Sequence, residues 1–344
     1  MNQIKRILIA YDGSSYADNA LLDLRLAGLS HEAEALIVTV SEGLVSAPAP
    51  VVEVAGAALA PRRVTSAFGA ATDQAVRLLA EAKGFATAAR DRVRSHFVDW
   101  DVDIKVLEGS PSRKLLAEAD QWKPDLIVVG SQGHSAFNRF ILGSVSKKLA
   151  TKSRSSVRVV RRQAEKGHYE PPRILIAVDG SPDAELAVRS VGSRVWPDQT
   201  EVRIVGLENT VTPSMIEHIF SSEAAIRDRH HEATTKALGM MGWAADELRA
   251  IGLKVSIAVR NGDPQSSLID EARKWKADSI FIGAYGIDHR GEQSGLGRVA
   301  ARLVTNAPST VEVVRRGYGP MNWMRQSSNG NHNPQLNWDT HIPG

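Results

Sequence analysis

The chain contains no cysteine among its 344 residues. This absence excludes disulfides, thiolate nucleophiles and cysteine-ligated zinc or iron–sulfur sites. Aromatic residues make up only 6% of the sequence, whereas hydrophobic residues as a whole make up 43%. The length favours two domains at roughly 150 residues each, and the aliphatic content is enough for two sizeable cores. Abundant aliphatic residues with few aromatics are typical of parallel sheets packed against helices.

Long apolar runs are also missing. No stretch approaches the ~20 residues needed to cross a bilayer, and residues 1–6 lead into a strand-like run without a signal-peptide pattern. We therefore expect a soluble, cytoplasmic protein that does not bind a membrane. A net charge of +3 gives little reason to expect nucleic-acid binding. The densest basic stretch is expected to be a solvated face, and it comprises Lys147, Lys148, Lys152, Arg154, Arg158, Arg161 and Arg162.

The chain repeats itself. Residues 6–14 (RILIAYDGS) recur with one substitution as residues 173–181 (RILIAVDGS), 167 positions later. Residues 109–111 (GSP) and 122–125 (WKPD) have counterparts 153 positions later at 262–264 (GDP) and 275–278 (WKAD), and residues 159–161 (VVR) recur at 313–315. Two copies of one domain follow from this self-similarity.

The offset between the copies shrinks along the chain because the first copy carries 14 extra residues. They fall in the proline-rich segment 46–61, which is expected to be an extended, mobile loop. We predict a first domain at 1–162, a linker at 163–172, a second domain at 173–316 and a disordered tail at 317–344, which is rich in Asn, Gly and Pro.

Short β-branched runs with the length of buried strands alternate with helical patterns in the first copy, at 7–11, 35–40, 103–107, 126–129 and 157–160. This alternation predicts an α/β fold, with two doubly wound parallel sheets of Rossmann-like type in tandem. Ligands of such sheets bind at the carboxyl ends of the strands, where the strand order reverses.

Glycines cluster just after the fourth strand of the first copy. Gly130 and Gly133 stand three apart, and nine residues then precede Gly143 and Ser144. Glycine allows close approach of the backbone to a ligand, and Gly143-Ser144 opens a helix expected at 145–151, whose free N–H groups attract an anion. The pattern indicates a phosphate-binding site, although Gly-x-x-Gly alone is common in ordinary turns.

The full arrangement, Gly-x2-Gly-x9-Gly-Ser after a buried strand together with Asp12-Gly13-Ser14 after strand one, resembles the ATP-binding pattern of the universal stress protein family. The resemblance covers about 310 residues. It implies a fold like that of the adenine nucleotide α-hydrolases, and binding of ATP, or of AMP or ADP, with Mg²⁺ as a companion of the phosphates. It also implies that the last strands of the two copies, 157–160 and 312–314, pair as an intrachain pseudo-dimer, with a homodimer as a further expectation.

The resemblance also implies roles for individual residues. Asp12 would meet the nucleoside, although it also fits a turn aspartate, and the backbone of Val40 would bond the adenine edge. Gly130 and Gly133 would line the ribose and phosphates. The phosphate chain would be held by Gly143, Ser144, Val145 and Ser146.

The second copy departs from this pattern. It keeps Asp179, Gly283 and Gly286, but ten residues separate Gly286 from Gly297, and Arg298 stands where serine is expected. Arg298 has the donors to meet a phosphate, but its bulk and the inserted residue alter the site. We therefore predict nucleotide mainly in the first domain and a weaker or empty second site.

Other chemistries find less support. The sequence has no Walker P-loop after either first strand, no Gly-x-Ser-x-Gly elbow, and a His230-His231-Glu232 run that lacks metal-site spacing. His134 and His289 stand in glycine loops, where an imidazole would lie beside bound phosphates, although loop polarity alone explains both equally well. The leading hypothesis is a stress-response regulator or sensor with an unidentified protein partner. The alternatives are a weak ATPase or phosphotransferase that uses Asp12 and His134, and a nucleotide-free interaction scaffold.

Overall fold

The computed structural model describes residues 4–42, 62–133, 142–161, 170–208, 223–286 and 295–318. The proline-rich segment, His134, His289, most of the expected linker and the tail beyond residue 318 lie outside the described residues, as do the side chains of His230, His231 and Glu232. The predictions made for them remain predictions.

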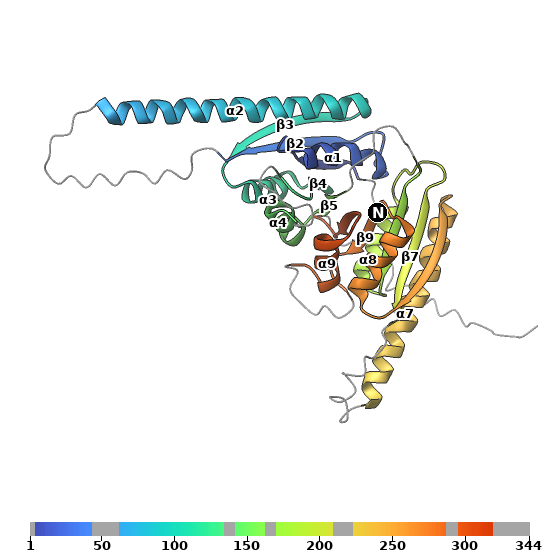
Figure 1. Cartoon of the computed structure of the whole chain (residues 1–344). Coiled ribbons are helices and arrows are strands. Elements are labelled where there is room, and N and C mark those ends of the chain that lie inside the picture. The colour runs from blue at the N-terminus through green and yellow to red at the C-terminus, as the bar shows by residue number, and fades with distance from the viewer. Residues whose placement is uncertain are drawn as a thin grey trace, which may run out of the picture.

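The first half alternates strands with helices, as the apolar runs predict (Figure 1). Its elements are β1 (Arg6–Ala10), α1 (Ser15–Asp23), the short 3-10 helix η1 (Leu24–Leu26), β2 (Glu34–Ser41), α2 (Arg62–His96), β3 (Asp101–Glu108), α3 (Pro111–Trp122), β4 (Leu126–Gly130), α4 (Ser144–Lys152) and β5 (Ser156–Val160).

The second half repeats this order. Its elements are β6 (Arg173–Val178), α5 (Pro182–Gly192), β7 (Glu201–Glu208), α7 (Glu223–Ala250), β8 (Lys254–Asn261), α8 (Pro264–Trp275), β9 (Ser279–Gly283), α9 (Arg298–Asn306) and β10 (Thr310–Val314). The first helix of each half begins in the same way, because the Ser14 and Ser181 side chains cap it by accepting from Ala17 N and Ala184 N.

One sheet runs through both halves, in the order β3-β2-β1-β4-β5-β10-β9-β6-β7-β8. Strands within each half are parallel, and the halves meet where β5 and β10 pair antiparallel. The expected pairing of the two last strands is therefore present. In each half the parallel order places the first strand between the second and the fourth, which creates the strand-order reversal that binds ligands in such folds.

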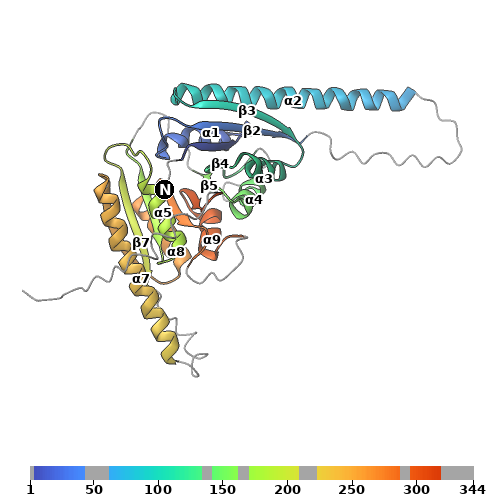
Figure 2. The same ribbon diagram turned by 180° about the vertical axis from the view of Figure 1, so that it is seen from behind.

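Helices cover both faces of the sheet, so most strands are buried on both sides (Figures 1 and 2). One apolar cluster joins both halves and includes Leu8, Val157, Leu175 and Val311. Two further clusters lie under α1 and α2 in the first half and under α5 and α7 in the second. A core that continues across the β5–β10 boundary makes the two halves one packed unit.

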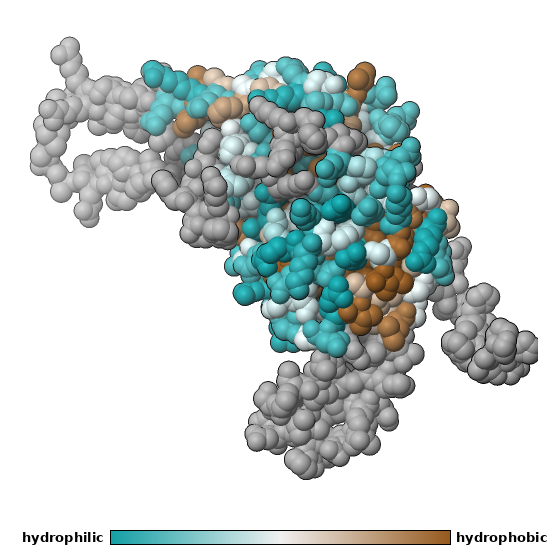
Figure 3. Space-filling model, turned by 45° about the vertical axis from the view of Figure 1, so that its right-hand side comes forward, coloured by the Kyte–Doolittle hydropathy of each residue, from teal (hydrophilic) through white to brown (hydrophobic). Residues whose placement is uncertain are grey.

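The described surface is mostly hydrophilic, with an apolar area on the second half (Figure 3). Among the exposed apolar side chains of that half are Ile257 and Val259 of β8, with exposed fractions of 45% and 44%. Among the described residues, none of the helices is both long and apolar enough to cross a membrane.

The expectation of a solvated basic face at 147–162 is wrong in part. Lys147, Lys148 and Arg154 are exposed, but Arg158 is completely buried and Arg161 is half-buried. The reason is tertiary, since the strand that carries Arg158 lies in the middle of the ten-stranded sheet beside buried carboxylates.

Candidate functional site

A cavity of about 1100 Å³ lies at the carboxyl ends of β1, β2 and β4 in the first half. Its walls also include parts of α2, α3 and the start of α4. The residues predicted for the first-half site all line it, namely Asp12, Val40, Gly130, Gly133, Gly143, Ser144, Val145 and Ser146. The sheet topology brings these residues together from segments more than a hundred positions apart.

Asp12 is held in a turn that faces the cavity. Its Oδ1 accepts a hydrogen bond from Ser14 N at 3.0 Å, which is the local turn role expected of an aspartate before glycine. Its Oδ2 lies against the backbone of Gly133, where an added Cβ would come within 2.6 Å. The turn role and the place on the cavity wall therefore belong to one side chain.

Gly130 is required by packing within the protein. A Cβ at this position would lie 2.7 Å from the carbonyl oxygen of Tyr16 in α1. Only glycine lets helix α1 pack this closely against the end of β4. The sequence predicts a glycine facing the ligand here, and the structure adds this second demand on the same position.

The start of α4 is tied to the end of β4. Gly143 N donates to Ser131 O at 2.8 Å, and the Ser146 hydroxyl, which is buried, lies 3.0 Å from the same carbonyl oxygen. The hydroxyl proton of Ser146 thus serves the glycine loop in this structure. Its predicted role as a phosphate donor stays a prediction.

The first turn of α4 presents positive potential to the cavity. The first helical bond of the segment runs from Lys147 N to Gly143 O, so the N–H groups of Ser144, Val145 and Ser146 have no partner within the helix. No acidic residue stands in this turn, and Lys147 also lines the cavity. Such a helix start attracts anions.

Residues that the sequence analysis did not single out complete the walls. Thr39 of β2 is 3% exposed, and its hydroxyl has no hydrogen-bond partner among the described residues. Phe85 and Glu81 of α2 and Leu115 of α3 also line the cavity. The one available signal was a threonine inside the otherwise apolar run 35–40.

Tyr11 lines the cavity as a neutral phenol. Its hydroxyl donates to Asp18 Oδ1 at 2.6 Å. Burial, and after it the Asp18 carboxylate, raise the pKa of Tyr11 above its usual range. A phenol held protonated in this way is a poor general base.

The second half reproduces the loop geometry. Asp179 Oδ1 accepts from Ser181 N at 3.0 Å, and an added Cβ on Gly286 would lie 2.7 Å from Asp179 Oδ2. Gly297 N donates to Ala284 O at 2.8 Å. Gly283 packs against Asp183 of α5, and Arg298 is exposed at the first residue of α9.

The side chains around this second loop differ from those of the first half. At the positions equivalent to Ser144, Ser146 and Thr39, the second half has Arg298, Ala300 and Gly206. The space beside Gly206 is taken by Met241 of α7, whose sulfur an added Cβ would overlap. The second half thus lacks a hydroxyl at each of these three positions, and a buried thioether lies beside one of them.

Comparison with known proteins assigns the chain to a family. A model of the universal stress protein family matches residues 3–161 and again residues 171–315. A universal stress protein of Mycolicibacterium smegmatis is 27% identical over 228 residues, which are 62% of this chain and 69% of the relative. The stress response protein NhaX of Bacillus subtilis is 26% identical over 163 residues, 45% of this chain and 97% of that protein.

The fold has counterparts among solved structures. The crystal structure of a universal stress protein from Archaeoglobus fulgidus superposes with a TM-score of 0.53 at 18% identity, and the match covers 91% of this chain and 98% of that one. Since the family model matches both halves in turn, the chain belongs to the universal stress protein family and carries two of its domains in tandem.

Proposed function

We propose that the first half binds an adenine nucleotide in the cavity at the ends of β1, β2 and β4, and that the chain acts as a nucleotide-dependent stress-response regulator. The observation that carries this proposal is the convergence of the eight pattern residues on one cavity wall. ATP, ADP and AMP share the base and the first phosphate, so the proposal leaves the number of phosphates to experiment.

The residues present fit such a ligand. Aliphatic side chains of Val38, Val40 and Leu115 offer an apolar environment for a base. The Thr39 hydroxyl, which is buried without a partner among the described residues, would turn from its buried position to bond the ligand. The amides at the start of α4 offer donors to phosphate oxygens. The apolar walls would hold the base, and the electropositive start of α4 would hold the phosphates.

A Mg²⁺ ion would depend on the nucleotide for most of its ligands. The described residues contain no group of three or more His, Asp or Glu side chains arranged to hold a metal. Asp12 is the carboxylate beside the glycine loop. Magnesium at such a site keeps several waters and binds phosphate oxygens.

Regulation is favoured over turnover by the state of the polar groups. Tyr11 is held neutral by burial and by the hydrogen bond to Asp18, and Asp12 accepts a backbone hydrogen bond in its turn. Neither is set up as a base beside a reacting phosphate. The proposed role is therefore occupancy-dependent binding, in which the ligand alters a surface that a protein partner contacts.

We further propose that the second half binds nucleotide more weakly or not at all. The absence of hydroxyls at the positions of Ser144, Ser146 and Thr39, and the placement of Met241 beside Gly206, support this asymmetry. A chain in which both sites are vacant would be an interaction scaffold, which is the alternative that the same differences motivate.

One experiment separates these functions. One sample of freshly purified protein is denatured, and the small molecules that it releases are identified by chromatography. A second, native sample is incubated with ATP and Mg²⁺, and the formation of ADP is measured. Retained or tightly binding nucleotide without ADP formation supports the regulator. Steady ADP formation that disappears in the Gly143→Val variant would replace it with an ATPase, and no measurable affinity would replace it with the scaffold.

A further inference from the structure

The antiparallel junction of β5 and β10 is close to a two-fold axis that relates the halves. Arg158 and Glu312 pair directly in the register, with Val159 opposite Val311 and Val157 opposite Val313. Arg158 and Glu312 also occupy the same place in the repeat, 154 positions apart. The two halves therefore face each other with equivalent residues, and these residues carry opposite charges.

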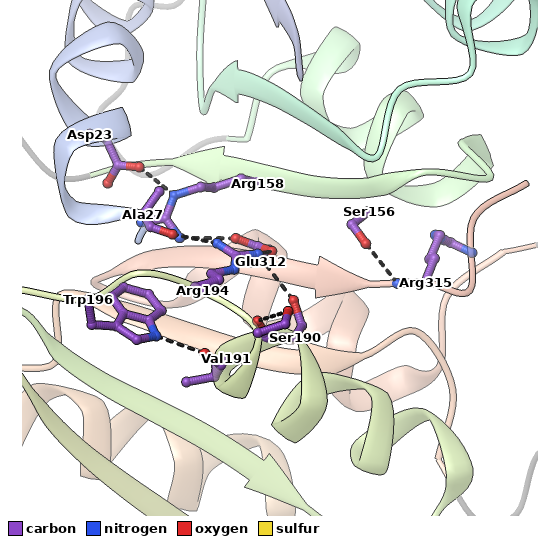
Figure 4. Close-up of polar contacts among 11 residues, drawn as sticks. Asp23, Ala27, Ser156, Arg158, Ser190, Val191, Arg194, Trp196, Glu312 and Arg315 are labelled. Carbon is purple, nitrogen blue, oxygen red and sulfur yellow. Dashed lines mark hydrogen bonds and ion pairs between the residues drawn. The ribbon is translucent and has the colours of Figure 1, made fainter. Parts of the chain in front are cut away.

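These two side chains belong to a buried network of four charges (Figure 4). Arg158 Nε contacts Asp23 Oδ2 at 2.5 Å, and Arg158 Nη1 contacts Glu312 Oε2 at 3.1 Å. The other Glu312 oxygen accepts from Arg194. The side chains of Arg158, Arg194 and Glu312 are at most 1% exposed, so their charges depend on one another for compensation.

Part of the junction is symmetric. Arg161 Nη2 donates to the carbonyls of Val304 and Thr305 in α9, both at 2.6 Å. Its counterpart Arg315 donates in the same way to Ala150 O at 2.8 Å in α4. Contacts of this kind are available to any pairing of these domains and cannot select between pairings.

The charged network breaks the symmetry at three positions. Asp23, Ala27 and Arg158 in the first half correspond to Ser190, Arg194 and Glu312 in the second. Arg194 Nη1 donates to the backbone oxygen of Ala27 in the opposite half at 2.7 Å, and Nη2 lies 3.2 Å from Ser190 Oγ in its own half. If a first half paired with a copy of itself, Arg158 would face Arg158, and a second half would bring Glu312 against Glu312.

Shape adds a second, independent difference. The ring of Trp196 lies over Gly28 so closely that an added Cβ on Gly28 would be 2.7 Å from it. The counterparts of Gly28 and Trp196 are Val195 and Leu29. A pair of second halves would place Trp196 against a valine, and a pair of first halves would leave Leu29 where the indole fills space.

We propose that these residues form a pairing code, by which the β5 edge of the first half accepts the β10 edge of the second half and rejects a copy of itself. The occupant of each edge is the other half of this chain. Like charges that face one another without water are strongly disfavoured, so the code acts mainly by exclusion. The proposal is independent of what the cavity binds.

Exchange of the network between the halves tests the code in the full-length chain. Two half-swapped variants are made. One gives the first half of the chain the network residues of the second half, and the other gives the second half the network residues of the first. The substitutions are Asp23→Ser, Ala27→Arg and Arg158→Glu in the first, and Ser190→Asp, Arg194→Ala and Glu312→Arg in the second.

Each half-swap alone gives both edges the same charges, and we expect it to lower the melting temperature by about 10 °C. The full swap, with all six substitutions, restores opposite charges and should recover most of this loss. An equimolar mixture of the two half-swapped chains should form 1:1 dimers in light scattering or native mass spectrometry, which neither forms alone.

Two results would overturn the code. One is a full swap whose loss of melting temperature equals the sum of the two half-swap losses. The other is a half-swapped chain that keeps the parent stability and oligomeric state. Because the full swap carries every substitution of the half-swaps, its recovery distinguishes mismatched pairing from a general failure to fold.

Discussion

The first and second halves of this chain share a strand order, a glycine loop and an aspartate turn, but they differ in what fills the space beside them. In the first half, Thr39 and Ser146 are among the residues that line a cavity of about 1100 Å³. In the second, Gly206 and Ala300 stand at these positions, and Met241 packs beside Gly206. The comparison shows that the glycines and turns of the repeat are kept while the side chains beside them differ, and we propose that this difference decides whether each half binds nucleotide.

The largest effect is expected from Met241→Ala in the second half. Met241 is 2% exposed and packs in an apolar cluster with Ala244 and Leu248. Its removal leaves a void, so we expect the free energy of unfolding to fall by about 2–5 kcal/mol. Denaturant unfolding measures this loss of free energy. Met240→Ala, at a half-buried neighbour, is the matched control and should cost less; an equal cost would contradict a specific filling role for Met241.

The next effect breaks the comparison at the phosphate end. A Cβ on Gly143 would lie 3.2 Å from Ser131 O and 3.3 Å from Ser146 Oγ, so Gly143→Val crowds the start of α4 and its neighbours must give by a few tenths of an ångström. We expect nucleotide affinity to fall by at least about tenfold, or about 1.4 kcal/mol. Gly297→Val is the equivalent change in the second half and should leave affinity unchanged. Equal losses in titration calorimetry would contradict the asymmetry.

Thr39→Val sharpens the comparison at the base end. The free protein loses a buried hydroxyl without a partner among the described residues, so its melting temperature should stay the same or rise. Nucleotide affinity should fall about fivefold, equivalent to ~1 kcal/mol, because one ligand hydrogen bond is lost. Thr39→Ser should retain most of the affinity. A lower melting temperature for Thr39→Val would show that the hydroxyl already serves the free protein.

The smallest effect concerns pH and a carboxylate of the second half. Burial opposes ionisation of Glu271, but hydrogen bonds from Arg260 and Arg203 outweigh it and lower the pKa of Glu271. Its contribution to stability is therefore present above the unfolded pKa of about 4.3 and is lost as the pH falls through the lower folded pKa. Glu271→Gln should cost at most about 1 kcal/mol at pH 7, and this cost should shrink as the pH falls below about 4. A cost independent of pH would contradict the charge assignment.

Much of the fold follows from the sequence in physical terms. Strand-length apolar runs and the repeat of residues 6–14 at 173–181 predict parallel α/β halves, and the last strands pair as expected. The glycine pattern leads to one cavity because the turns after parallel strands meet at one edge of a sheet. Gly130, Gly133 and Gly143 could be singled out because glycine carries conformational meaning within a few residues.

The remainder depends on contacts between distant segments. Thr39 and Phe85 become cavity walls only when α2 packs over β2, which the local pattern of neither segment predicts. Arg158 reads as part of a basic surface in the sequence, since the carboxylates that surround it come from Asp23 and Glu312, more than a hundred residues away on either side. Burial of a charge is decided by tertiary pairing and leaves little local signal.

The most direct test of the asymmetry is the number of nucleotides bound per chain. Native mass spectrometry of the full-length protein with increasing ATP, repeated with AMP, counts them without assuming which half binds. At an ATP concentration that just fills one site, the two halves as described predict one nucleotide per chain, and a clearly lower occupancy at the same concentration in the Gly143→Val variant, whose affinity is at least about tenfold weaker. Two nucleotides filling in parallel, with one remaining in Gly143→Val and one in Gly297→Val, would contradict it.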